Sequence, residues 1–175
     1  MTQGQSEAER VRSYLVTQAN KLTLADLVAK VRADTAPLRE AAALIPPELL
    51  SRRPGENDWS AAEVWTHILQ VNEQGAAAIE GILANGRPPE QLRDVISGET
   101  RPQFTSGEQY YAAYHQRREQ LLTRVLKARG DEYLDVKIHH QLFGDLSWRE
   151  WLLFMRVHDL DHLRQLQAIA RALGC

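Results

Sequence analysis

The chain has a single cysteine among its 175 residues, and that cysteine, Cys175, is the last of them. With no second thiol there is no intrachain disulfide, and the chain is consistent with a reducing compartment. Nucleophilic catalysis through Cys175 is not expected either, because chain ends are usually poorly ordered.

Long hydrophobic runs are also lacking. The longest apolar run that contains large side chains covers residues 151–155, far short of the roughly 20 residues that cross a bilayer as a helix. The first ten residues are polar and lack the hydrophobic region of a signal peptide. We therefore expect no membrane partner and a soluble, cytoplasmic protein.

An excess of charge of one sign is absent too. The chain has 21 basic and 23 acidic residues, a formal net charge of -2, so no global field attracts nucleic acid. No phosphate-binding glycine loop, nucleophile elbow or dinucleotide fingerprint is found. A content of 43% hydrophobic and 25% charged residues fits one ordinary globular domain.

Apolar residues recur at helical spacing, and no stretch alternates well enough to predict a strand. The first long helix starts at Thr23 and is kinked by Pro37 or restarts there. The others start at Ser60, Ser106 and Ser147, and glutamates at positions 63 and 150 complete capping boxes for two of them. The expected ends lie near residues 86, 130 and 174.

The connections complete the expected architecture. Residues 87–105 form a long polar crossover with a short helix near 90–95, and such a connection usually crosses the fold or covers a site. Residues 131–146 are expected to be irregular. Residues 1–22 are predicted to be an arm or short helix, and 23–175 one domain. Four long helices with one crossover predict an all-α four-helix bundle.

Three histidines stand on otherwise apolar helix faces. His158 and His162 are four residues apart, so both imidazoles leave the same face of a helix. His67 interrupts an apolar stripe between Val64 and Val71. A divalent metal is the simplest group that holds three inward imidazoles together. The alternative is three separate core or rim histidines, each with its own local hydrogen-bond partner.

Glu63, Asp161 and Arg118 are the candidate catalytic residues. Glu63 lies one turn before His67 and Asp161 beside the histidine pair, where each could accept an imidazole N–H. Gln165, one turn after His162, suits the same role. In the alternative, Glu63 is only a helix cap and Asp161 is solvated, as is Asp159.

Arg118 falls within the apolar stripe of the third long helix. It either binds an anionic substrate group there or extends outward from the edge of the stripe. The nearby tyrosines are expected in the core or at its rim, and three further histidines show no partner spacing: Tyr110, Tyr111 and Tyr114; His115, His139 and His140.

The segments 59–67, 143–151 and 158–165 carry a resemblance to a known family. In this order and spacing the chain resembles the DinB/YfiT-like family of bacterial proteins over residues 24–173. The resemblance implies a four-helix bundle in which one histidine of the second helix and two of the fourth bind a divalent metal. Carried over, these are His67, His158 and His162. Residues before Thr23 are not part of the family pattern.

The resemblance also implies an activity. Characterised relatives look like metal-dependent hydrolases, or like transferases and isomerases that use low-molecular-weight thiols such as bacillithiol or mycothiol. Zinc or nickel, and also iron, suit the ligand set, and a homodimer is implied. We therefore expect a metal-dependent thiol S-transferase or hydrolase acting on a small electrophilic molecule. The alternative is a metal-binding or stress-associated bundle without turnover.

Overall fold

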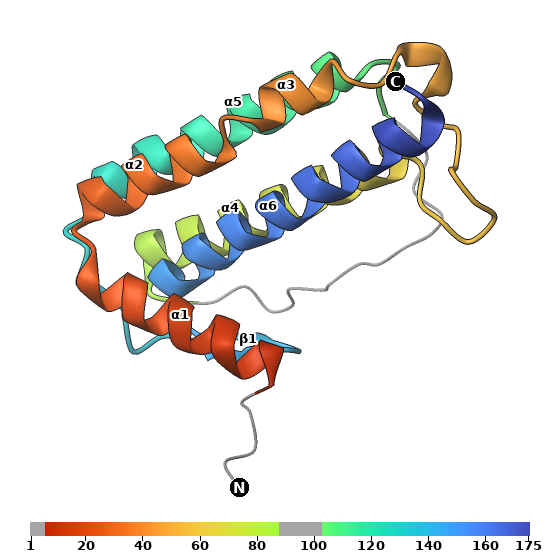
Figure 1. Cartoon of the computed structure of the whole chain (residues 1–175). Helices are drawn as coiled ribbons and strands as arrows, with labels where there is room; N and C mark the ends of the chain where they lie inside the picture. The colour runs from red at the N-terminus through yellow and green to blue at the C-terminus, as the bar shows by residue number, and fades with distance from the viewer. Residues whose placement is uncertain (1–5, 88–102) are drawn as a thin grey trace, which may run out of the picture.

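The computed structural model describes residues 6–87 and 103–175. Within them the protein is a bundle of long helices (Figure 1), which confirms the all-α prediction. The helices are α1 (Glu7–Lys21), α2 (Leu24–Thr35), α3 (Leu38–Ala42), α4 (Ala61–Asn85), α5 (Gly107–Leu126) and α6 (Trp148–Leu173), with a 3-10 turn η1 (Pro47–Leu49).

The first predicted helix is divided into α2 and α3, and the break falls at Pro37 as expected. Together α2 and α3 lie along α5, while α4 packs between α5 and α6 (Figure 1). These helices are the four members of the bundle. The extra helix, α1, packs across one end of α6.

The predicted helix starts are confirmed. Ser60 and Ser147 form capping boxes with Glu63 and Glu150, and the Ser106 side chain accepts a hydrogen bond from a first-turn backbone N–H of α5. The helices α4 and α6 end at Gly86 and Gly174, whose φ values of 63° and 78° are left-handed, a backbone conformation that glycine adopts without strain.

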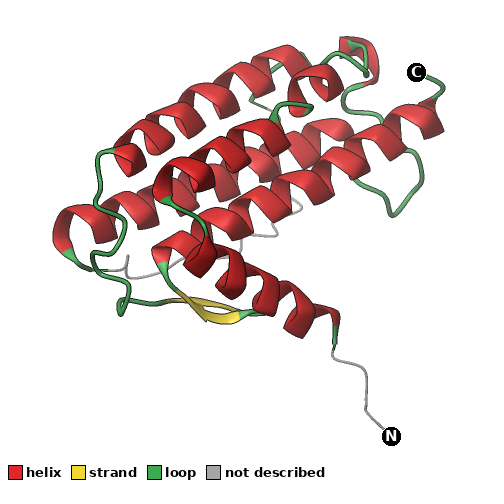
Figure 2. Ribbon diagram, turned by 60° about the vertical axis from the view of Figure 1, so that its left-hand side comes forward, coloured by secondary structure: helices red, strands yellow, loops and turns green. Residues whose placement is uncertain are grey.

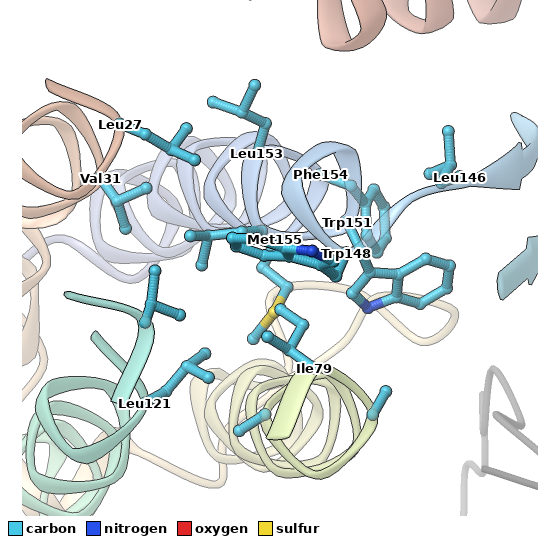
Figure 3. Close-up of a cluster of buried hydrophobic side chains, with 14 of the residues drawn as sticks. Leu27, Val31, Ile79, Leu121, Leu146, Trp148, Trp151, Leu153, Phe154 and Met155 are labelled. Atoms are coloured by element: carbon cyan, nitrogen blue, oxygen red, sulfur yellow. The ribbon is translucent and has the colours of Figure 1, made fainter. Parts of the chain in front are cut away.

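Two hydrophobic clusters form the core. The first joins α1, α2, α4, α5 and α6, and the second joins α3, α4, α5 and the C-terminal half of α6. Figure 3 shows part of the first cluster, with the Met155 sulfur directed at α4. Gly75 of α4 permits this approach, because a Cβ there would lie 2.5 Å from the Met155 sulfur.

A short hairpin in the 131–146 segment was not predicted. β1 (Ile138–His140) pairs antiparallel with β2 (Gly144–Leu146), beside α1 (Figure 2). Strands of three residues are too short to show alternation in the sequence. The turn is held by His140, whose Nδ1 accepts the backbone N–H groups of Leu142 and Phe143.

Two other expectations concern the 87–105 connection and membrane-spanning segments. The short helix expected near 90–95, with most of the crossover, lies outside the described residues. Among the helices that are described, none has the length and hydropathy needed to span a membrane.

Candidate metal centre

The structure brings the three predicted histidines together. His67 lies on α4, and His158 and His162 lie one turn apart on α6. The Nε2 atoms of His67 and His158 are 2.9 Å apart. One ring nitrogen from each residue lies within 4.8 Å of the other two. This is a compact donor group that could hold one metal ion.

The position of the group in the core explains why the three rings meet. On α4 and on α6 the histidines fall where the first hydrophobic cluster ends and the second begins. Aromatic rings border them: the Trp59 ring meets His67 edge-on at 5.4 Å between centroids, and Phe154 lies 6.0 Å from His158. Helix packing on both sides therefore fixes the spacing of the rings.

Burial keeps His67 and His162 neutral. Loss of solvation, followed by the nearby His158 and His162, lowers the pKa of His67 from 6.5 to about 3. Burial is also the largest cause of the lowered pKa of His162, and His158 is the next. Neutral imidazoles offer the lone pairs that a metal requires, so no proton has to be displaced from His67 or His162 near pH 7.

The Nδ1 atoms of the three histidines differ in their hydrogen-bond partners. The Nδ1 of His162 lies 2.7 Å from Oε1 of Gln165, the partner expected from the sequence. Because an amide oxygen only accepts, this contact places the proton of His162 on Nδ1 and leaves Nε2 free. Among the described residues, the buried Nδ1 atoms of His67 and His158 have no hydrogen-bond partner.

In residues 6–87 and 103–175, no further histidine, cysteine or carboxylate joins the group. Three imidazole donors fit a divalent metal such as zinc, and they leave coordination positions for other molecules. The ligand set therefore fits a metal ion.

Glu63 is occupied at the start of α4. Its Oε2 accepts hydrogen bonds from the Ser60 backbone N–H at 2.7 Å and the Ser60 hydroxyl at 2.9 Å, and Arg53 pairs with both of its oxygens. Burial alone would raise the pKa of Glu63, but the bonds from Ser60 and Arg53 lower it. Asp161 is exposed on α6. The structure places neither carboxylate in the histidine group.

Arg118 does not extend outward, and it is only 2% exposed. Its Nη2 lies 2.9 Å from Oδ2 of Asp159, and its Nε donates to Oδ1 of Asn72 at 2.7 Å. The expectation of a solvated Asp159 is wrong, because this carboxylate points from α6 towards α5 and is 1% exposed. Tyr114 donates its hydroxyl to the same carboxylate at 2.7 Å.

Sequence reasoning thus missed Asp159 and Asn72. The available signal was Arg118 itself, because a cation within an apolar stripe needs an anion on a facing helix. Which carboxylate pairs with Arg118 depends on how α5 and α6 pack against each other. That relation is not visible in either helix alone.

A groove of about 390 Å³ lies between α4 and α5. It is lined by Thr66 and Gln70, which flank His67 along α4, and by Glu73 and Arg117. Most of the residues that line it are polar, although most of the surface that they expose to it is apolar.

Comparison with known proteins places this geometry in a family. The family model described as DinB superfamily matches residues 30–166, a span that contains all three histidines. The chain is also 24% identical to a Bacillus subtilis (strain 168) protein named "Uncharacterized protein YuaE", over 70% of this chain and 83% of the relative. That name assigns no activity, so the chemistry has to be argued from the three histidines.

Proposed function

The chain belongs to the DinB superfamily, and we propose that His67, His158 and His162 bind one divalent metal ion in the active site of a small-molecule enzyme. The observation that carries the proposal is the convergence of three ring nitrogens within 4.8 Å. Zinc and nickel suit three imidazoles best, and iron is also compatible.

A bound divalent ion supplies Lewis acidity, which makes a water molecule or a thiol more acidic. The residues of this chain contribute the orientation and the protonation state. Gln165 holds His162 with its Nε2 free, and burial keeps His67 neutral. With three protein ligands, two substrate classes fit: a low-molecular-weight thiol transferred to a small electrophilic molecule, or an electrophile that is hydrolysed.

Metal content is the first test. Protein stripped by a chelator and then dialysed against zinc or nickel should retain about one ion per chain, because the three ligands form one site. His158→Ala should lose this ion. The matched control is His139→Ala, which removes an exposed imidazole paired with Asp145 outside the group. Wild-type protein that takes up neither ion would refute the proposal.

Turnover is the second test. Metal-loaded protein is screened with low-molecular-weight thiols and electrophilic small molecules, with and without the thiol, so that transfer and hydrolysis are separated. A catalytic site predicts that His158→Ala loses turnover while its helical circular dichroism stays unchanged. A loaded protein without turnover under either condition would favour the alternative, a metal-binding or stress-associated bundle.

We also propose that the protein is a homodimer, as the family resemblance implies, and that it is cytoplasmic. Large apolar side chains are left exposed on its surface, at Leu44, Leu126, Tyr133 and Leu142, and they are compatible with an interface. Light scattering at micromolar concentration should give twice the 19.9 kDa mass of the chain, and cell fractionation tests the compartment. A monomer would contradict the proposed homodimer.

A further inference from the structure

A buried polar chain connects three helices behind the histidine group. It runs from Asn72 on α4 to Arg118 on α5 and to Asp159 on α6, with Tyr114 bonded to the same carboxylate. None of these four side chains is more than 2% exposed. Buried charges are costly unless they are paired, and here the Arg118–Asp159 ion pair joins α5 to α6 directly beside His158.

The direction of the network is fixed at both ends. The Asn72 amide nitrogen donates to the Tyr114 carbonyl at 3.3 Å, so its oxygen is left to accept from Arg118. At the other end, Tyr114 and Arg118 both approach Oδ2 of Asp159. The second carboxylate oxygen, Oδ1, is therefore turned away from α5, and it lies 3.6 Å from Nδ1 of His158.

That contact bears on which nitrogen of His158 carries its proton. At 3.6 Å it is longer than a hydrogen bond, so its effect is electrostatic. A proton on Nδ1 faces the carboxylate favourably, whereas a lone pair on Nδ1 would face a negative charge. The 2.9 Å approach of the His158 and His67 Nε2 atoms needs one proton between the two nitrogens. With Nδ1 of His158 protonated, that proton belongs to His67.

We propose that Asp159 is a positioning residue that keeps the proton of His158 on Nδ1 and thereby leaves Nε2 of His158 free to bind the metal. The metal half of this inference rests on the proposed function, whereas the proton position does not. Carboxylates often act on metal-binding histidines in this way, through the nitrogen that faces away from the ion.

Arg118 keeps Asp159 in the required charged form. The Arg118 guanidinium lies 2.9 Å from Oδ2 of this carboxylate, and the Tyr114 hydroxyl donates to the same oxygen at 2.7 Å. The pKa of Arg118 is in turn raised: burial opposes the charge, and Asp159 more than offsets it. A carboxylate paired with a buried guanidinium in this way can hold one imidazole tautomer.

The direct test is Asp159→Asn with histidine ring 15N spectra of the metal-free protein. In wild type the proton of His158 should be on Nδ1. In the variant, the amide oxygen should keep the donors Tyr114 and Arg118, which turns the amide NH2 towards His158. Its Nδ1 then has to accept, and the proton should move to Nε2. A His158 proton on Nε2 in wild type, or on Nδ1 in both proteins, overturns the proposal.

Metal affinity tests the consequence. Because Nε2 of His158 would carry a proton in Asp159→Asn, zinc affinity measured by competition with a chelator should fall about 10- to 100-fold. The matched control is Asp161→Asn, which removes a negative charge from an exposed site between the same two ligands. An equal loss in both variants would mean that net charge, and not position, is responsible.

A second variant guards against poor folding, since Asp159→Asn leaves Arg118 buried without its counterion. The double variant R118M/D159N removes both charges together and retains the Tyr114 hydroxyl, so the same proton shift is expected. Wild type that binds no zinc would end the proposed function and the metal half of this inference, while the ring spectra still decide the proton position. Wild-type affinity in both Asp159 variants would end the inference alone.

Discussion

His67 shows at the residue scale what the site demands of a side chain. Its ring lies against two other imidazoles, with centroids 4.8 Å from each, and its Nδ1 is buried without a partner among the described residues. A protonated ring here would face two potential cations and little solvent. The residue is therefore suited to bind a metal and poorly suited to bind a proton.

A pH dependence of stability follows for the metal-free protein. The pKa of His67 is about 3 in the folded chain and 6.5 ordinarily, so between these values only the unfolded chain takes up the proton. The free energy of unfolding should therefore fall as the pH drops below about 6.5, with a limiting slope of about 1.4 kcal/mol per pH unit for this proton. Urea titrations at pH 7, 6 and 5 measure it.

The control for that prediction is His67→Gln, which replaces the titrating ring by a neutral polar side chain. Its unfolding free energy should change less between pH 7 and pH 5 than that of wild type. Equal pH dependence in the two proteins would show that His67 does not cause the effect.

At the scale of elements, the approach of α4 to α6 depends on a missing side chain. At Gly75 a Cβ would lie 2.5 Å from the sulfur of Met155, which is fully buried. At Gly81, two turns further along α4, the nearest atom would be the Arg87 carbonyl oxygen at 3.7 Å, an ordinary contact. The two glycines of one helix therefore have opposite roles.

Alanine substitution should separate them. Gly75→Ala should destabilise the protein by about 1–3 kcal/mol, because Met155 must be displaced in a close-packed core. Gly81→Ala should raise the free energy of unfolding by up to about 1 kcal/mol, because alanine favours the helix. Urea unfolding measures both. The packing argument fails if Gly75→Ala is as stable as Gly81→Ala.

The same scale shows what the sequence could and could not predict. The starts of α4 and α6 were predictable because a serine and a glutamate three residues later act within one turn. The histidine group was predictable because residues four apart share a helix face, whatever lies opposite. Burial of Asp159 was not, since it depends on Arg118 of another helix. The hairpin was not, because two strands of three residues leave no pattern.

At the scale of the whole molecule, we expect that the fold does not depend on a metal ion. Both hydrophobic clusters are built from side chains of several helices, and α1 is attached to α6 by bonds of its own. Arg149 donates to the carbonyl oxygens of Ala19 and Leu22, and Arg156 donates to the Tyr14 hydroxyl at 3.1 Å. The core of the bundle and the attachment of α1 therefore do not involve the three histidine rings.

Metal removal should therefore leave the bundle folded. Chelator treatment is expected to preserve the helical circular dichroism at 25 °C, while the melting temperature falls. Zinc added at 100 times its dissociation constant should restore about 2.7 kcal/mol by mass action. Loss of helical signal on chelation would instead assign the ion a structural role, as in small domains that fold only with metal.

The histidines lie where the two hydrophobic clusters meet, and this has a consequence for local opening. Parts of a protein can open separately, each with its own free energy. An ion held by α4 and α6 at that boundary would cross-link these two helices, each of which contributes to both clusters. Amide hydrogens near residues 64–72 and 155–164 should then exchange more slowly with solvent deuterium when metal is bound.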